Sequence, residues 1–181
     1  MTLTVPVSRR MFQLFLKLCC LGLLAFCPWL SGCAGYHLGT VNAYGIHSIH
    51  VNVFKNKVLV PRIEEQMSNA VVRQFQIDGS IHIASPDQAD AIMDGEIIAW
   101  ERHPLRFQKK DLLVTREYRL VIAAHITVKD KQGKILVDRK RLEGETTFFI
   151  GDDLVASERQ ALPVAADDLA KNIVEQVVEG W

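Results

Sequence analysis

REYRLVIAAHITVKD, residues 116–130, is the clearest strand pattern in this sequence. Every second side chain is apolar or aromatic and falls on one face of an extended chain: Tyr118, Leu120, Ile122, Ala124, Ile126 and Val128. The opposite face carries polar side chains, among them Arg119, His125 and Lys129. This alternation predicts a strand with one face in the core and the other in water.

Strand patterns continue on both sides of this segment. A Lys-Gln-Gly turn leads into KILVDRKRLEGETTF, residues 134–148, so the two segments predict a long hairpin. Upstream, ADAIMDGEIIAWERHPLRF, residues 89–107, predicts another strand. In that strand Gly95 suggests a bulge, and Pro104 suggests an edge position or a bend.

Two short strands, at 46–54 and 81–85, flank a predicted helix. Pro61 suits the first position of this helix, and apolar side chains then follow at helical spacing. Gly79 is the expected stop, because glycine readily adopts the left-handed conformation that ends helices. The segment from 46 to 85 therefore predicts a strand-helix-strand unit.

A second helix is predicted near the end of the sequence. Ser157 and Gln160 form a capping box, and Gly180 ends the apolar stripe. Pro163 either kinks this helix or marks its start. Because one sheet face is apolar and the other charged, both helices should cover the same face, which predicts a two-layer α+β sandwich.

The N-terminal region predicts a secretory signal. The first seventeen residues hold three basic side chains and no acidic one, and residues 18–30 carry no charge. As a helix this apolar stretch would span about 20 Å, which is too short for a hydrocarbon core of about 30 Å. A basic head followed by a short apolar stretch is typical of a signal peptide. Either Met1 or Met11 could be its first residue.

The apolar stretch ends in LSGC, residues 30–33, which resembles the lipobox of bacterial lipoproteins. The resemblance implies that Cys33 is linked to diacylglycerol and becomes the acylated N-terminus. The other three cysteines precede Cys33, so it would be the only cysteine of the mature chain. Ala34 follows in place of an aspartate, which by resemblance to known sorting rules favours the periplasmic leaflet of the outer membrane.

Three parts are therefore expected: a removed signal peptide (1–32), a lipidated N-terminus with a short tether (33–45) and a single domain (46–181). The mature chain has 181 − 32 = 149 residues, the size of one ordinary domain. It keeps 18 basic side chains against 21 acidic ones, a net charge of −3, which gives no reason to expect nucleic-acid binding. The lipid on Cys33 is the only non-protein group expected, with no cofactor and no metal.

The motifs of common enzymes are missing from the sequence. The histidines are scattered, without partners at metal-ligand spacing. Asp94 and Glu96 could share a strand face, as paired catalytic carboxylates do, but exposed charges on an edge strand are the commoner explanation. There is no nucleophile elbow and no glycine-rich phosphate loop. We therefore expect a protein that is not an enzyme.

Basic side chains cluster twice. One cluster, in a predicted loop before the long strand, consists of Arg106, Lys109 and Lys110; the other, on its hairpin partner, consists of Arg139, Lys140 and Arg141. Such clusters suit the phosphate groups of a lipid head group. The alternative is that they solvate the surface and protect a strand edge.

Taken in order, the segments resemble the LPS-assembly lipoprotein family, the LptE-like proteins of the outer membrane. The resemblance rests on the lipobox, on GYHLG (35–39), on SIHVNVFKNKVLVPRIEEQMSNAVVRQFQIDGSIHI (48–83) and on the strands that follow. It implies two helices packed on one face of a mostly antiparallel four-stranded sheet. It also implies a plug and assembly partner of a large outer-membrane β-barrel, the LptD-like translocon protein, with lipopolysaccharide as a ligand of some members.

A second function comes from another class of protein, the lipoprotein activators of peptidoglycan synthases. That family also has a strand like Ala89–Ile97, with the pattern ADA-x-x-x-GEI. Its members usually carry a long Pro-rich tether, whereas the tether here is only about ten residues, judged by where strand alternation begins. The short tether favours a domain that stays near the membrane.

Overall fold

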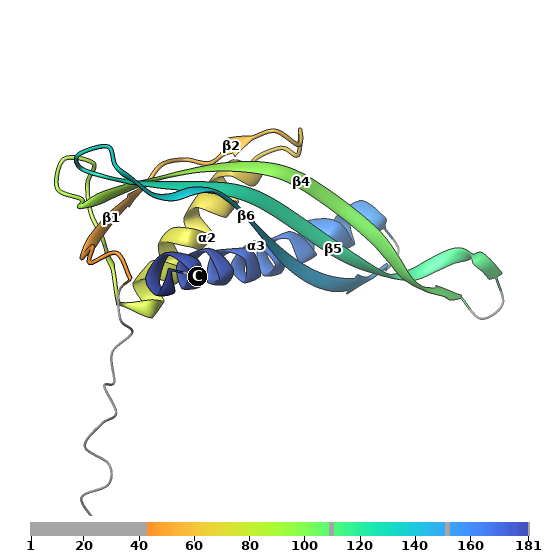
Figure 1. Cartoon of the computed structure of the whole chain (residues 1–181). Coiled ribbons are helices and arrows are strands. Elements are labelled where there is room, and N and C mark those ends of the chain that lie inside the picture. Colours follow the sequence, from red (N-terminus) through yellow and green to blue (C-terminus); the bar gives the residue numbers. More distant parts are fainter. Residues whose placement is uncertain (1–42, 109–110, 151–152, 181) are drawn as a thin grey trace, which may run out of the picture. The chain divides into compact units, whose positions relative to one another are not determined.

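The computed structural model describes residues 43–108, 111–150 and 153–180, all within one compact unit, Gly39–Trp181. Side chains are described outside 106–116. The elements in chain order are β1 (Ser48–Val51), β2 (Lys55–Asn56), α2 (Ile63–Asp78), β3 (His82–Ile83), β4 (Ala91–Gln108), β5 (Asp111–Asp130), β6 (Ile135–Phe149) and α3 (Leu154–Glu179). Figure 1 shows both helices on one face of a twisted sheet, as the amphipathic strands predicted.

The sheet differs from the expectation of four mostly antiparallel strands. Within the described residues it has six strands in the order β3-β1-β4-β5-β6, with β2 also paired to β4. β1 runs parallel to β3 and to β4, whereas β4, β5 and β6 are antiparallel. The crossover through α2 returns the chain in its original direction, which makes β1 and β3 parallel. Alternation in a sequence indicates which face of a strand is buried, but not which strand lies beside it.

Gly95 has a different role from the predicted bulge. The register of β4 against β5 is regular across Gly95, which lies opposite Ile126. A Cβ at this position would lie 2.3 Å from the ring of Phe54, which is buried between β1 and β2. The glycine therefore makes room for an aromatic ring of the core. The register shifts of β4 lie further along, between Ile97 and Ala99 and after Pro104.

Helix α2 buries one apolar stripe and ends as predicted. Met67, Val71 and Phe75 are fully buried, and Gly79 ends the helix in the left-handed conformation with φ 75°. Ser68, also buried, accepts a hydrogen bond from the main-chain N of Phe54 at 2.9 Å. This bond satisfies a main-chain group that the break between β1 and β2 leaves outside the sheet ladder.

Helix α3 starts earlier than the sequence predicted. Its N-cap is Asp153, whose carboxylate accepts a hydrogen bond from Val155 N at 2.9 Å, so the capping box at Ser157 is not the cap. Pro163 lies inside the helix instead of at its start. Gly180 ends the helix with φ 76°, as expected. A local side-chain bond to Asp153 decides the start, and the apolar stripe alone does not reveal it.

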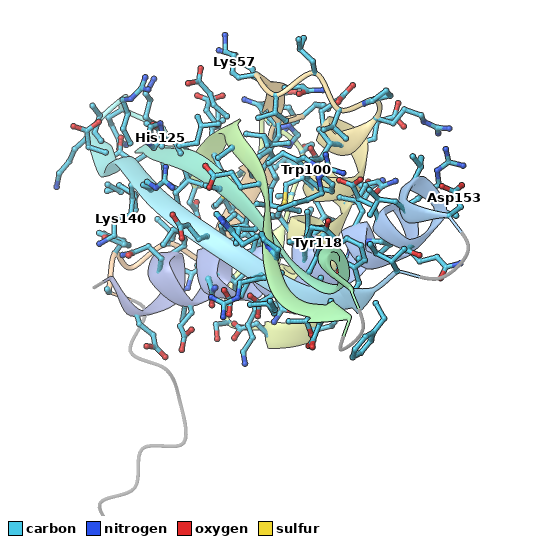
Figure 2. All side chains as sticks on the ribbon, turned by 90° about the vertical axis from the view of Figure 1, so that its right-hand side faces the viewer. Lys57, Trp100, Tyr118, His125, Lys140 and Asp153 are labelled. Atoms are coloured by element: carbon cyan, nitrogen blue, oxygen red, sulfur yellow. The ribbon has the colours of Figure 1, made fainter. Side chains whose placement is uncertain are left out.

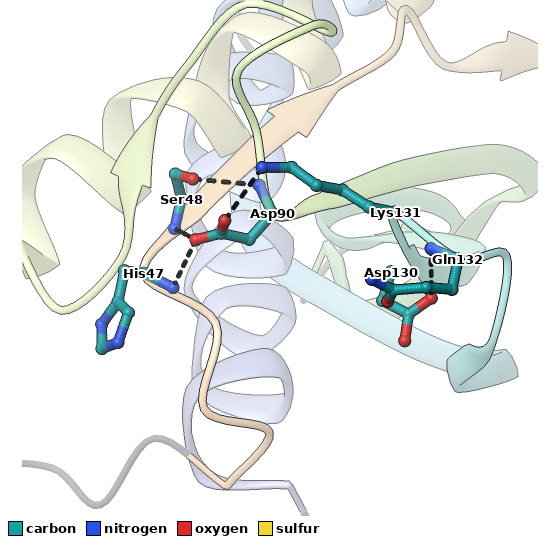
Figure 3. A network of polar contacts seen from close by, with 6 residues as sticks. All are labelled: His47, Ser48, Asp90, Asp130, Lys131 and Gln132. Carbon is teal, nitrogen blue, oxygen red and sulfur yellow. Dashed lines mark hydrogen bonds and ion pairs between the residues drawn. The ribbon is translucent and has the colours of Figure 1, made fainter.

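Asp90 joins three separate segments of the domain (Figure 3). Its Oδ2 accepts hydrogen bonds from the main-chain N of His47 and of Ser48, each at 3.1 Å. Its Oδ1 accepts from Lys131 Nζ at 3.2 Å, and its own N donates to Ser48 Oγ at 3.0 Å. Asp90 thus connects the start of β1 and the start of β4 to the β5–β6 turn.

Hydrogen bonding by Ser48, followed by His47 and Lys131, lowers the pKa of Asp90 from 3.8 to about 2. A carboxylate with a lowered pKa stabilises the fold above its unfolded pKa, and this stabilisation is lost as the pH falls through the folded pKa. We therefore expect Asp90→Asn to lower the melting temperature at neutral pH. The difference from wild type should shrink between about pH 4 and pH 2. Thermal unfolding followed by circular dichroism across this range measures both effects, and a pH-independent difference would contradict them.

Candidate functional site

The helices leave one face of the sheet uncovered. On this open face β5 presents His125 and Thr127, which are half-buried, and Lys129, which is exposed. Between them and the hairpin end lie Val121, half-buried, and Ala123, fully buried. The open face therefore has the polar side chains that the alternation in 116–130 predicted, together with a small apolar centre at Val121 and Ala123 that was not predicted.

A row of ionic contacts crosses four strands of this face. Glu96 of β4 lies 3.9 Å from Lys55 Nζ on β2 and 3.7 Å from Arg139 Nη2 on β6. Arg139 Nη2 also donates to Nδ1 of His125 on β5 at 3.3 Å. Exposed ion pairs of this kind contribute about 0–1 kcal/mol each to stability. These pairs therefore add little to the stability of the fold. Their main effect is to place positive and negative charges next to each other on the open face.

A β-bulge in β6 positions Arg139. Ile126 pairs with Lys140 and Val128 with Val137, so β6 uses three steps where β5 uses two. Arg139 has a left-handed backbone, with φ 39°, which is unusual for a residue other than glycine. Bulges re-aim side chains and are frequent near functional sites. The sequence has no glycine at this position, so the bulge could not be predicted from it.

The structure places Arg106 and Arg141, one from each basic cluster, far apart. Lys140 is exposed and makes no ion pair with a described residue, and Arg141 pairs with Glu143. Arg141 lies opposite His125 of β5, whereas Arg106 lies opposite Glu117, eight positions further along the same strand. At about 3.4 Å per residue this separation is about 27 Å. One small head group therefore cannot contact both Arg106 and Arg141.

Arg106 of the other cluster lies in strand β4 and not in the loop that the sequence predicted. β4 extends to Gln108 and β5 begins at Asp111, so Arg106 belongs to a strand. Lys109 and Lys110 fall outside the described residues, as does Cys33. The ladder continues beyond the end of β6, since Phe107 pairs with Thr115 of β5. This end of the hairpin is a two-stranded arm.

A groove of about 680 Å³ between the starts of α2 and α3 was not predicted. Trp100 and Leu162 are among its apolar lining residues. Trp100 Nε1 donates to Glu158 Oε1 at 2.8 Å, and Arg102 lies 3.3 Å from the same carboxylate. Figure 2 shows Trp100 and Asp153 on the side of the molecule away from His125 and Lys140. The bulge between Ile97 and Ala99, just before Trp100, was not predicted from the sequence either, so no sequence signal indicated this groove.

One wall of the groove is a loop with unusual backbone. Leu59 and Arg62 have left-handed conformations, with φ 59° and 63°, and Leu59 is 91% exposed. Asn56 organises the loop, because its amide donates to Val60 O at 2.8 Å and its Oδ1 accepts from Val58 N at 3.0 Å. The loop thus keeps the side chain of Leu59 exposed to solvent beside the groove.

The residues that the structure describes do not form an evident catalytic or metal-binding site. Asp94 accepts a hydrogen bond from Asn52 at 2.9 Å, and Glu96 belongs to the ionic row, so the two carboxylates have separate structural partners. β4 is also an interior strand, so these are not edge charges. Across 43–108, 111–150 and 153–180, no three potential metal ligands gather. Over the same ranges no helix is long and apolar enough to cross a membrane.

A model of the family described as "Lipopolysaccharide-assembly" (LptE) matches residues 46–177, which is almost the whole described domain. The chain belongs to the LptE family. Membership gives it a part in lipopolysaccharide assembly, which is not an enzymatic role. It also favours this function over activation of a peptidoglycan synthase. A search of curated proteins gave no match.

Solved structures confirm the fold of this LptE-family chain at low sequence identity. A hypothetical protein of Chlamydia trachomatis aligns with a TM-score of 0.51 and 12% identity, over 74% of this chain and 96% of the other. A minor lipoprotein of Acinetobacter baumannii aligns with a TM-score of 0.50 and 12% identity, over 74% and 94%. Identities this low establish a shared architecture and carry no detail of function.

Proposed function

We propose that this protein is the plug and assembly partner of an LptD-like outer-membrane β-barrel, through which lipopolysaccharide passes to the outer leaflet. A lipid on Cys33, at the start of the short tether 33–45, holds the domain 46–181 at the periplasmic leaflet. The family match is the main support for this proposal. The open face of the sheet is the surface that we expect to contact the barrel.

The open face suits the inside of a barrel. Wide barrels have polar interiors, so a plug needs a surface that stays polar when it is enclosed. Glu96 lies between two cations, Lys55 and Arg139, and Arg119 of β5 lies 3.6 Å from Glu145 of β6. This surface carries both signs of charge at short range. Charges so arranged determine orientation and specificity more than affinity.

The basic clusters are the proposed contacts for lipopolysaccharide head groups or for the barrel wall. Lys140 and Arg141 are exposed on β6, and Arg106 belongs to the two-stranded arm. Phosphate groups bind arginine and lysine through charge-assisted hydrogen bonds. Because Arg106 and Arg141 are about 27 Å apart along β5, each cluster would act on a different part of the complex.

Affinity purification of the full-length protein from detergent-solubilised outer membranes tests the partnership. Mass spectrometry should identify one large β-barrel protein in equal amount. Recovery of a peptidoglycan synthase without a barrel would replace the plug function by the alternative one. Recovery of neither partner would contradict the proposed partnership while leaving family membership intact.

Removing the cations of one cluster should weaken lipopolysaccharide binding about ten-fold, because charge-assisted hydrogen bonds are worth about 1.5–3 kcal/mol. One variant carries glutamine at Arg139, Lys140 and Arg141, and another at Arg106, Lys109 and Lys110. A control removes three cations of the helix layer, Arg73, Arg159 and Lys171. Titration of detergent-solubilised full-length protein with lipopolysaccharide measures the affinity. Equal affinity for all variants would reject head-group binding and leave the plug function standing.

A further inference from the structure

The groove between the starts of α2 and α3 has two apolar side chains at its floor, Trp100 and Leu162. Leu162 is buried, and Trp100 is half-buried with part of its surface packed against the core. The indole Nε1 donates to Glu158 Oε1 at 2.8 Å, and Arg102 lies 3.3 Å from the other oxygen of that carboxylate. These contacts hold the ring in place, so a ligand that binds to its exposed part has little ordering of this side chain to pay for.

The α2 wall of the groove offers two side-chain amides. Gln66 and Asn69 both line the groove, and they are three residues apart, so they lie on the same side of the helix. Both are exposed, and neither side chain forms a hydrogen bond with another described residue. Each amide offers hydrogen-bond donors and an acceptor at once. This wall therefore suits a ligand that also carries both kinds of group, such as another amide.

The charged side chains of the groove balance one another. Its lining includes two cations and two anions: Arg62, Arg159, Glu65 and Glu158. Arg62 Nη2 lies 3.3 Å from Glu65 Oε2, and Glu158 is engaged by Arg102. A net charge of zero gives a phosphorylated ligand no electrostatic advantage here. In this respect the groove differs from the basic clusters that we propose for lipopolysaccharide.

These features separate the common classes of ligand. The volume of about 680 Å³ falls within the range of about 300–1,000 Å³ that is typical of small-molecule sites. About half of the lining residues are polar, which does not suit an acyl chain. Two walls are helices, which offer an extended peptide no strand edge to pair with. A sugar ring fits better, because it has an apolar face for the indole and polar groups around its edge.

We propose that this groove binds an uncharged N-acetylated sugar unit of a glycan chain. The indole of Trp100 packs on the apolar face of the sugar ring, and the amides of Gln66 and Asn69 exchange hydrogen bonds with its acetamido group. Such sugars occur in peptidoglycan, in the compartment where the proposed lipid anchor would place this domain. The inference goes beyond the proposed function, because it needs neither the barrel nor the basic clusters.

Titration of the detergent-solubilised full-length protein with soluble tetrasaccharides tests the proposal. Chitotetraose and cellotetraose share one backbone, but only chitotetraose carries acetamido groups. In a Trp181→Phe background Trp100 should be the only tryptophan left after signal cleavage, so its fluorescence reports on the groove. Chitotetraose should shift this emission in a saturable way, and cellotetraose should bind about ten-fold more weakly. No saturable shift with chitotetraose, or equal binding of the two sugars, would overturn the proposal.

The α2 wall is tested by a double variant with a matched control. Gln66→Ala combined with Asn69→Ala should weaken chitotetraose binding about ten-fold, because the hydrogen bonds of both amides are lost. The control is Gln76→Ala, which changes an exposed glutamine of the same helix outside the groove and should bind like wild type. Circular dichroism checks that both variants are folded. Equal affinity of the double variant and the control would reject the amide contacts and the proposal with them.

Two substitutions of Trp100 examine the ring itself. Trp100→Phe keeps an aromatic face and Trp100→Leu keeps only an apolar side chain, while both lose the hydrogen bond to Glu158. Isothermal titration calorimetry with chitotetraose should therefore find a larger loss of affinity for the leucine variant. An equal loss in the two variants would show that the sugar does not pack on the ring.

Competition with two larger glycans identifies the source of the sugar. Solubilised peptidoglycan strands should displace chitotetraose, whereas deacylated lipopolysaccharide, which is phosphorylated, should not. Displacement by deacylated lipopolysaccharide alone would overturn the selection for an uncharged sugar. None of these outcomes affects the proposed partnership with a barrel, because recovery of the barrel from outer membranes does not depend on sugar binding.

Discussion

The Gly144→Ala variant should unfold about 3 kcal/mol more easily than wild type, because a methyl group at this position has no space. Gly144 of β6 faces α3, and a Cβ there would lie 2.2 Å from the main-chain N of Leu169 and 2.5 Å from its Cβ. The nearest atom belongs to the backbone of the helix and cannot rotate away. The whole of α3 would have to move off the sheet.

Such a shift would also disturb the contacts beside Gly144. Leu169 is fully buried, and Asp168 holds the main-chain N of Glu145. Denaturant unfolding of the purified full-length protein measures the loss. Thr147→Ala, at an exposed position of the same strand, is the control and should change stability by less than about 0.5 kcal/mol. If Gly144→Ala had the same free energy of unfolding as the control variant, the close packing of α3 on β6 described here would be wrong.

Cys33→Ala should release the protein from the outer membrane almost completely. This prediction rests on the proposed lipid anchor. Each buried methylene contributes about 0.8 kcal/mol, so several acyl chains hold a protein essentially permanently, and the variant would lack all of them. Membrane fractionation followed by immunoblotting should find the variant in the soluble periplasmic fraction.

Cys27→Ala is the matched control for the anchor. Cys27 lies in the segment that signal cleavage should remove, so this variant should stay in the membrane and keep its lipid. Mass spectrometry of the N-terminal peptide would show the acyl groups directly. A Cys33→Ala protein that remained membrane-bound, or a wild-type Cys33 without lipid, would reject the anchor and the localisation that depends on it.

The candidate surface was only partly visible in the sequence. The charged face of β5 follows from alternation alone, since Arg119, His125 and Lys129 fall on one side of any extended chain. The ionic row could not be predicted, because it joins Lys55, Glu96 and Arg139 from three strands whose order depends on the crossover through α2. Gln176 lies within the apolar stripe of α3, and the sequence does not predict that it lines a groove together with Leu142 of β6.

By itself, the sequence determined the properties that depend on near neighbours in the chain. The period of two in 116–130 placed one face of β5 in the core, and Gly79 and Gly180 ended the two helices because glycine accepts the left-handed conformation. The tertiary structure alone decided which strands are neighbours, and it gave Gly95 and Gly144 their roles. Those glycines are required because Phe54 and the backbone of α3 occupy the space that a side chain would need, and such contacts arise only when distant segments pack together.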